Sequence, residues 1–206
     1  VPVEMYPARH FLAPMLEELR PYQQVMTPLV LVYEQLLAMV ADDESFRVED
    51  LNRLLEFLDA QASLLDTETL DNAEAFASSW CTMQYNRSRY EFLPVLYELV
   101  LRRLRSGRIY KNGLLGVHFF QLAVVVGLRM KKLDWVNTFL EEHRGRLVGG
   151  KQSEESLNFN RARYLLHVGD YEQALDLLAA NYEVTQYKIA AKVLEIQALY
   201  DSDSPL

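Results

Sequence analysis

The residues from Gly145 to Lys151 carry the glycines and the lysine of a phosphate-binding loop. In such a loop the backbone N–H groups cradle phosphates, the lysine reaches them, and a following Ser or Thr hydroxyl binds magnesium. The chain has Gln152 in place of that hydroxyl, and the residues before the glycines have a helical pattern where the motif requires a strand. We therefore expect a flexible connection between helices here, with no bound nucleotide or other cofactor.

The histidines and the cysteine show no spacing that indicates a metal site or a nucleophile. The histidines are His10, His118, His143 and His167. None stands at metal-ligand spacing from another or from Cys81, and Glu142 and His143, as neighbours on a helix, face different sides of it. Cys81 has no basic residue close by in the sequence to activate its thiol. We expect no enzyme and no metal, although an active site assembled from residues distant in sequence stays an alternative.

One polar stripe is better placed to bind a ligand. Within the apolar stretch 114–130, His118, Gln121, Val125 and Arg129 follow one another at spacings of three, four and four. They therefore share one face of a helix. A helix so apolar elsewhere has little reason to carry such a stripe unless the stripe faces water or a ligand. A solvated groove without a ligand and a binding groove are the two alternatives.

The elements that must position these residues are predicted to be helices. Prolines at 2, 7, 14, 21 and 28 restrict residues 1–27 to an irregular lead-in with short helices. Thr27 and Pro28 then indicate an N-cap and a first helical residue, and Asp42 to Ser45 closes the helix that follows. Apolar residues at helical spacing predict helices over 29–41, 48–65, 67–86, 90–106, 114–130, 134–146, 154–168, 171–181 and 186–200. No segment has the alternation of a strand, so the predicted fold class is all-α, built of antiparallel helix hairpins.

The segment from Gly169 to Leu175 resembles the turn of a tetratricopeptide-like (TPR-like) helical hairpin. Ala162, Gly169, Tyr171 and Ala174 occupy the small, turn, aromatic and small positions of that family. Related patterns occur upstream. They consist of Lys131 at a spacing of 38 before Gly169 with Val124 as its small residue, and Ser88 a further 43 residues before with Cys81 as its small residue.

The resemblance implies a right-handed α-α superhelix over residues 28–206, a TPR-like solenoid that acts as a scaffold for other proteins. It also implies that the polar stripe lines a concave groove, with matching positions in the next hairpin at Ser156, Phe159, Arg163, Leu166 and His167. The expected partner-binding residues are accordingly His118, Gln121, Val125, Arg129, Phe159, Arg163 and His167. The expected partner is a peptide or a protein.

The charge is unevenly distributed along a chain of net charge −8. Residues 101–163 carry 13 basic and 5 acidic residues, whereas residues 1–100 carry 6 basic and 17 acidic residues. The basic segment predicts either contacts with acidic segments of the same chain or an acidic partner. The alternative function is therefore binding of nucleic acid or another acidic ligand, and the residues that would bind it are Arg102, Arg103, Arg105, Arg108 and Lys111.

Composition and the chain ends give the remaining expectations. The most apolar stretch, 114–128, is shorter than a membrane span, and the N-terminal residues lack the pattern of a signal peptide. With one cysteine there is no internal disulfide, so we expect a cytoplasmic protein that does not interact with a membrane. Ser204 and Pro205 read as the start of another helix, which favours a segment of a longer protein. Ile189, Val193 and Ile196 of the last predicted helix should then be partly uncovered.

Overall fold

The structure is a computed structural model that describes residues 9–19, 21–22, 26–41 and 45–203. The described residues form ten α-helices and one pair of two-residue strands, so the predicted all-α class is confirmed. The residues at Pro2, Pro7 and 42–44, where the lead-in and a turn were expected, lie outside the described ranges. The chain divides into two compact units, residues 1–108 and 109–206.

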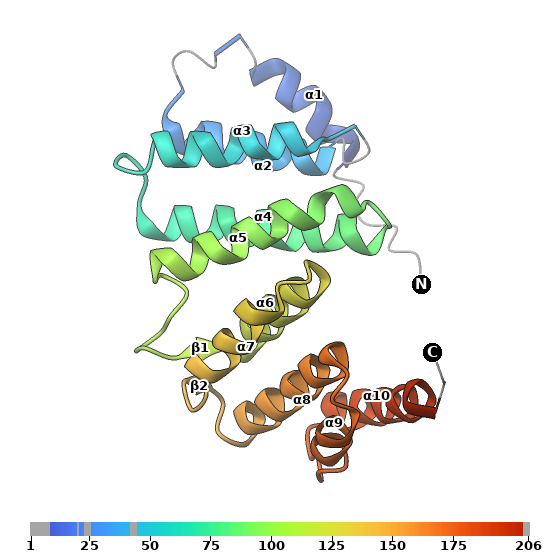
Figure 1. The fold of residues 1–206 in the computed structure, drawn as a ribbon. Helices are drawn as coiled ribbons and strands as arrows, with labels where there is room; N and C mark the ends of the chain where they lie inside the picture. Colours follow the sequence, from blue (N-terminus) through green and yellow to red (C-terminus); the bar gives the residue numbers. More distant parts are fainter. Residues whose placement is uncertain (1–8, 20, 23–25, 42–44, 204–206) are drawn as a thin grey trace. The chain divides into compact units, whose positions relative to one another are not determined.

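The first unit contains five α-helices and a short 3₁₀ turn (Figure 1). These are α1 (Arg9–Leu19), α2 (Pro28–Ala41), α3 (Val48–Ala60), α4 (Thr67–Asn86), the 3₁₀ turn η2 (Tyr90–Phe92) and α5 (Leu93–Ser106). Helix α2 begins at Pro28 as predicted. Helix α4 begins after Asp66, whose carboxylate accepts a hydrogen bond from the Thr69 N–H at 2.7 Å. Such an N-cap satisfies one of the free N–H groups of the first turn.

Two helices of the first unit differ in extent from the prediction. The helix expected over 48–65 ends at Ala60, because the chain tightens into turns in which Leu64 N–H donates to the Gln61 carbonyl at 2.9 Å. The helix expected over 90–106 begins as the 3₁₀ turn and becomes α-helical at Leu93, which leaves Pro94 in the first α-helical turn. Proline is tolerated at that position since its missing N–H would have no partner there.

Trp80 holds the core of the first unit together. Its side chain is 4% exposed, and its indole N–H donates to the Met39 carbonyl of α2 at 2.9 Å. Its ring makes T-shaped contacts with the rings of Phe46 and Phe92, and the ring centroids are 5.0 Å apart in both pairs. A buried indole with a partner for its N–H contributes both apolar area and a fixed geometry. Trp80 therefore fixes α4 against α2 and η2.

The second unit contains the other five α-helices and both strands (Figure 1). These are β1 (Leu115–Gly116), α6 (Val117–Arg129), α7 (Leu133–Glu142), β2 (Leu147–Val148), α8 (Lys151–Val168), α9 (Tyr171–Leu178) and α10 (Thr185–Asp203). The strands pair in parallel, Leu115 with Leu147 and Gly116 with Val148. The sequence did not predict them because two residues are too few to show alternation, and their pairing is a tertiary contact between loops.

The first helices of three hairpins end in the same turn. At the ends of α4, α6 and α8, the residues Ser88, Lys131 and Gly169 have φ angles of 66°, 55° and 82°. In each turn the next N–H donates to a carbonyl five residues back, from Arg89 to Gln84, from Lys132 to Gly127 and from Asp170 to Leu165. This is the Schellman motif, which satisfies carbonyls at a helix end. The three positions aligned by the sequence therefore share one backbone geometry.

The close approach within the α6–α7 hairpin occurs at Gly127. The sequence placed the small residue of this hairpin at Val124, which is buried but is not small. A Cβ built on Gly127 would lie 2.6 Å from Val136 Cγ2 and 2.8 Å from the Trp135 ring. Only glycine leaves room for α7 at this distance.

A compact core joins α8, α9 and α10. Its buried members are Phe159, Ala162, Leu178, Tyr182, Tyr187 and Ala191. Glu155 of α8 fixes the entry to α10, because its carboxylate accepts the N–H groups of Glu183 at 2.8 Å and Val184 at 3.0 Å. On α10 the exposed fractions of Ile189, Val193 and Ile196 are 63%, 60% and 70%. The prediction that these three side chains are uncovered is confirmed.

Candidate functional site

The second unit has a cavity of about 410 Å³ lined by α6, α8 and α10. Helix α6 brings Arg129 to it from its last turn, α8 brings Arg163 and His167 from its C-terminal half, and α10 brings Gln197. The lining residues are Val125, Leu128, Arg129, Arg163, Leu166, His167, Leu194 and Gln197. The cavity therefore combines apolar walls with two arginines.

Four of the seven residues predicted for the groove line this cavity. They are Val125, Arg129, Arg163 and His167. His118 is exposed and Gln121 half-buried on α6, and neither is among the residues that line the cavity. The sequence missed Leu128, Leu194 and Gln197. The last two lie on α10, and no spacing within one helix indicates which faces of two other helices it will meet.

The predicted placement of Phe159 in the groove needs correction. Its side chain is 1% exposed and packs against Tyr182 and Tyr187, with ring centroids 6.5 Å and 5.5 Å away. Phe159 therefore belongs to the core of α8, α9 and α10. It reaches the site only through Arg163, whose guanidinium carbon lies 4.5 Å from the Phe159 ring centroid. The physical reason is size, since an aromatic side chain at this position gains more by burial than by lining an open groove.

Arg163 is a half-buried cation without an acceptor among the described residues. Its Nη1 is buried and has no hydrogen-bond partner there. Loss of hydration lowers the pKa of Arg163, and the positive charge of Arg129 lowers it further, while Tyr187 acts in the opposite direction. The contact with Phe159 offsets part of the lost hydration, because a cation is attracted to an aromatic face.

His167 lies at the exposed rim of the cavity. Its Nδ1 is 2.9 Å from the Arg163 carbonyl oxygen, which can only accept a hydrogen bond, so Nδ1 carries the proton. This hydrogen bond holds the ring in one orientation. The sequence expected a role for His167 at this rim, and the structure places it among the lining residues.

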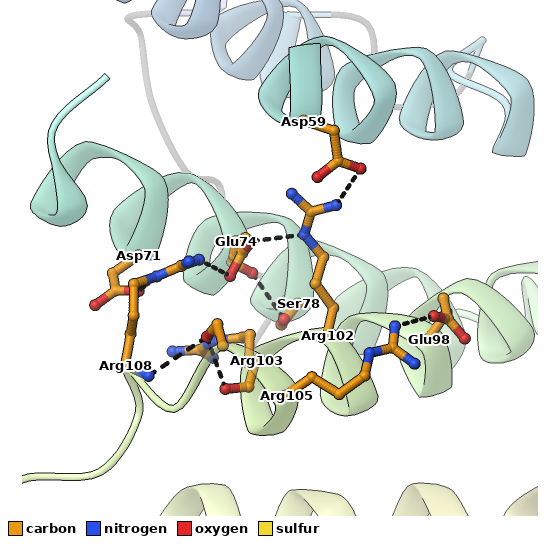
Figure 2. A network of polar contacts seen from close by, with 10 residues as sticks. Asp59, Asp71, Glu74, Ser78, Glu98, Arg102, Arg103, Arg105 and Arg108 are labelled. Atoms are coloured by element: carbon orange, nitrogen blue, oxygen red, sulfur yellow. Dashed lines mark hydrogen bonds and ion pairs between the residues drawn. The ribbon is translucent and has the colours of Figure 1, made fainter. Parts of the chain in front are cut away.

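Two of the arginines predicted to bind nucleic acid, Arg102 and Arg108, are bound to carboxylates within the first unit (Figure 2). Arg102 Nε donates to Glu74 at 2.6 Å and its Nη1 to Asp59 at 2.7 Å. Arg108 Nε donates to Asp71 at 2.6 Å and its Nη2 to Glu74 at 2.8 Å. The Glu74 side chain is 1% exposed, so both arginines are fixed by a buried charge.

These ion pairs tie helices together. Arg102 of α5 joins α3 and α4 through Asp59 and Glu74, and Arg105 pairs with Glu98 within α5 at 2.5 Å. A buried carboxylate left without its partners would be costly, which explains why two arginines converge on Glu74. The basic segment was expected to contact either acidic segments of the same chain or an acidic partner. Arg102 and Arg108 do the first, since both form ion pairs within the chain. Lys111 lies in the second unit and is exposed.

The glycine-rich loop has a different structure from the one predicted. The sequence indicated a helix directly before the glycines, but α7 ends at Glu142 and strand β2 lies inside the motif itself. Leu147 and Val148 are paired with β1, so this part of the loop is extended and cannot curl around a phosphate. Lys151 instead pairs with Glu183. The loop connects α7 to α8.

Cys81 and His143 are buried structural residues. Burial raises the pKa of the Cys81 thiol to about 12, so the thiol stays protonated at neutral pH and is a poor nucleophile. His143 Nδ1 donates to the Phe139 carbonyl at 2.8 Å, and its Nε2 accepts from the Tyr110 hydroxyl at 2.9 Å. Both histidine nitrogens are therefore used within the second unit.

Metal-ligand clusters and membrane-spanning helices are both absent from the described ranges. No group of three or more His, Cys, Asp or Glu residues in these ranges could hold a metal ion. No helix of the same ranges is long and apolar enough to cross a membrane.

Comparisons of the chain with protein-family models, with curated proteins and with solved structures found no match. The geometry of the site therefore carries the functional argument.

Proposed function

We propose that the chain is a non-enzymatic protein-interaction scaffold and that the cavity of the second unit binds a peptide or a protein segment. The observation that supports this most directly is the composition of the cavity wall. Half of its lining residues are apolar, and the others include two arginines and a histidine that are not engaged in ion pairs within the described part of the chain. Apolar pockets with a few placed polar groups are the usual form of a binding site.

The proposal includes a tetratricopeptide-like architecture. The shared turn geometry of the α4, α6 and α8 ends supports helical hairpins of one kind. In a right-handed superhelix of such hairpins, the first helices line the concave side, and α6 and α8 are the helices that carry Arg129 and Arg163. An extended or helical peptide is the ligand that a groove of this type accepts.

The alternative function, binding of nucleic acid through residues 101–163, has weaker support. Arg102 and Arg108 hold buried or half-buried carboxylates, and Arg105 is paired within its own helix. Phosphate contacts would require these ion pairs to break first. We therefore retain the peptide-binding proposal.

A selection with randomised peptides displayed on phage tests this proposal. The immobilised protein is expected to enrich peptides that bind the wild type and fail to bind Leu166→Trp, whose larger side chain fills the cavity. The control is Val168→Trp, which adds the same ring two residues away at an exposed position of α8 outside the cavity. Selection of no peptide, or equal binding to both variants, would contradict the proposal.

A further inference from the structure

We propose that the cavity recognises an acidic side chain, with a carboxylate of the bound peptide lying against Arg129 and Arg163. This inference rests on the proposed function, because it specifies the chemistry of the segment that the cavity binds. It predicts that the partner segment contains Asp or Glu, whose carboxylate would contact the two arginines.

The charge of the cavity favours an acidic ligand. Its lining contains two arginines and a histidine and no aspartate or glutamate. Glu155 of α8 and Glu195 of α10 are engaged elsewhere, since Glu155 caps the entry to α10 and Glu195 pairs with Lys192 at 2.5 Å. The positive charge of this cavity is therefore not neutralised by its own walls, and a carboxylate would be attracted to it.

The position of Arg163 also favours a ligand that supplies a hydrogen-bond acceptor. Arg129 lies in the last turn of α6, where a cation also favours the helix dipole, so its charge has a local explanation. Arg163 lies inside α8, half-buried beside a second arginine, and its contact with the Phe159 ring offsets only part of its lost hydration. A guanidinium that loses hydration without gaining an acceptor is unfavourable, and proteins retain such groups where a ligand supplies the acceptor.

A second orphaned group lies close to Arg163. The Tyr187 side chain is 2% exposed, and its hydroxyl has no hydrogen-bond partner among the described residues. Two buried polar groups without partners so close to one another are unusual, since buried polar atoms are paired in most structures.

The apolar walls define the rest of the ligand. Val125, Leu128, Leu166 and Leu194 surround the arginines. An inorganic anion would leave these walls in contact with water, whereas a peptide with an apolar side chain beside an acidic one would cover them. Arginine binds a carboxylate through two parallel N–H groups, which fixes orientation as well as affinity. We therefore infer a segment in which Asp or Glu neighbours an apolar residue.

The experiment extends the phage selection to the chemistry of the selected peptides. Peptides enriched on the wild type are expected to contain Asp or Glu next to an apolar residue. Synthetic copies with blocked termini should bind about tenfold more weakly or worse when that Asp or Glu is replaced by Asn or Gln. Arg163→Gln and Arg129→Gln should weaken binding of the acidic peptide by a similar factor and leave binding of the amide peptide unchanged.

The matched control is Arg161→Gln. Arg161 lies on the same helix, two residues from Arg163, and pairs with Glu141 outside the cavity. It removes the same unit of charge, so a general loss of positive potential would affect it equally. We expect binding of the acidic peptide to Arg161→Gln to remain within about twofold of the wild type, as for a charge away from the contact.

The outcomes separate this inference from the proposed function. Enriched peptides that occupy the cavity but lack acidic residues, or whose amide copies bind as well, would overturn the carboxylate site and leave the scaffold proposal standing. Selection of no peptide would overturn both. Titration with inorganic phosphate forms the last arm, and displacement of the acidic peptide by low millimolar phosphate would indicate a site for small anions in place of a peptide.

Discussion

At the residue scale, we expect Arg163 to lower the stability of the free protein and a bound ligand to offset this loss. We expect Arg163→Met to be as stable as the wild type or more stable, by up to about 1 kcal/mol, because it removes a half-buried cation and keeps an apolar contact with Phe159. Urea denaturation of both proteins measures this difference. A loss of more than about 1 kcal/mol would show instead that Arg163 serves the fold, since exposed substitutions usually change stability by about 0.5 kcal/mol or less.

Phe159 leads to the opposite expectation. Because it is buried against Tyr182 and Tyr187, Phe159→Ala should lower the free energy of unfolding by about 3–5 kcal/mol. Thermal and urea denaturation followed by circular dichroism would measure the loss. Near-native stability of the variant would contradict the core position of Phe159 and favour the groove position that was predicted from the sequence.

His143 makes the stability of the second unit depend on pH. Burial lowers the pKa of His143 below its ordinary value of 6.5, so the unfolded chain takes up a proton before the folded one does. The contribution of neutral His143 is therefore fully present above pH 6.5 and is lost as the pH falls below it. The Tyr110 hydroxyl and the Phe139 carbonyl contact the ring, the charge of Glu142 acts to raise its pKa, and the charge of Arg146 acts to lower it.

The measurement compares urea denaturation of the wild type and His143→Gln between pH 7.5 and pH 5. We expect the stability of the wild type to fall over this range by more than that of the variant. The comparison uses the change with pH and not the absolute stability, since the variant also loses hydrogen bonds. Parallel pH profiles would show that His143 does not carry the dependence.

At the element scale, the α6–α7 hairpin depends on Gly127. Alanine favours a helix over glycine by about 1 kcal/mol, so local propensity predicts that Gly127→Ala is stabilising. We expect destabilisation by about 1–3 kcal/mol, because the added methyl group overlaps Val136 and Trp135. Gly116→Ala is the control, with open space around its Cβ, and should change stability by about 0.5 kcal/mol or less. Denaturation midpoints of the two variants decide the point.

The elements show what the sequence could predict. The start of α2 was predicted from Thr27 and Pro28, because a cap and a first-turn proline act on their own helix. The start of α4 at Thr67 was also predicted, whereas its cap by Asp66 was seen only in the structure. The end of α3 at Ala60 and the pairing of β1 with β2 did not follow, since both depend on turns and contacts between segments far apart.

The candidate site also contains residues that the sequence could predict and residues that it could not. Val125 and Arg129 were predicted from the spacing within one helix, and Arg163 and His167 from the resemblance to a tetratricopeptide-like hairpin. Leu194 and Gln197 required the packing of α10 against α8, and the burial of Phe159 required the tyrosines of a later segment. Periodicity gives the face of a helix, whereas tertiary packing decides which part of that face is open.

At the scale of the whole molecule, we expect the negative net charge of the chain to affect nucleic-acid binding more than the basic segment 101–163 does. The net charge is −8, and Arg102 and Arg108 of that segment are bound to Asp59, Asp71 and Glu74. We expect no tight binding of a single-stranded or duplex oligonucleotide at physiological salt, because phosphates would compete with carboxylates already in contact and would be repelled by the acidic remainder. A fluorescence anisotropy titration at about 150 mM salt measures this directly. Binding that weakens steeply with added salt and is lost in Arg103→Glu with Arg105→Glu would reverse the ranking of the two functions. Such a result would mean that the basic segment forms the site and that the cavity between α6, α8 and α10 does not.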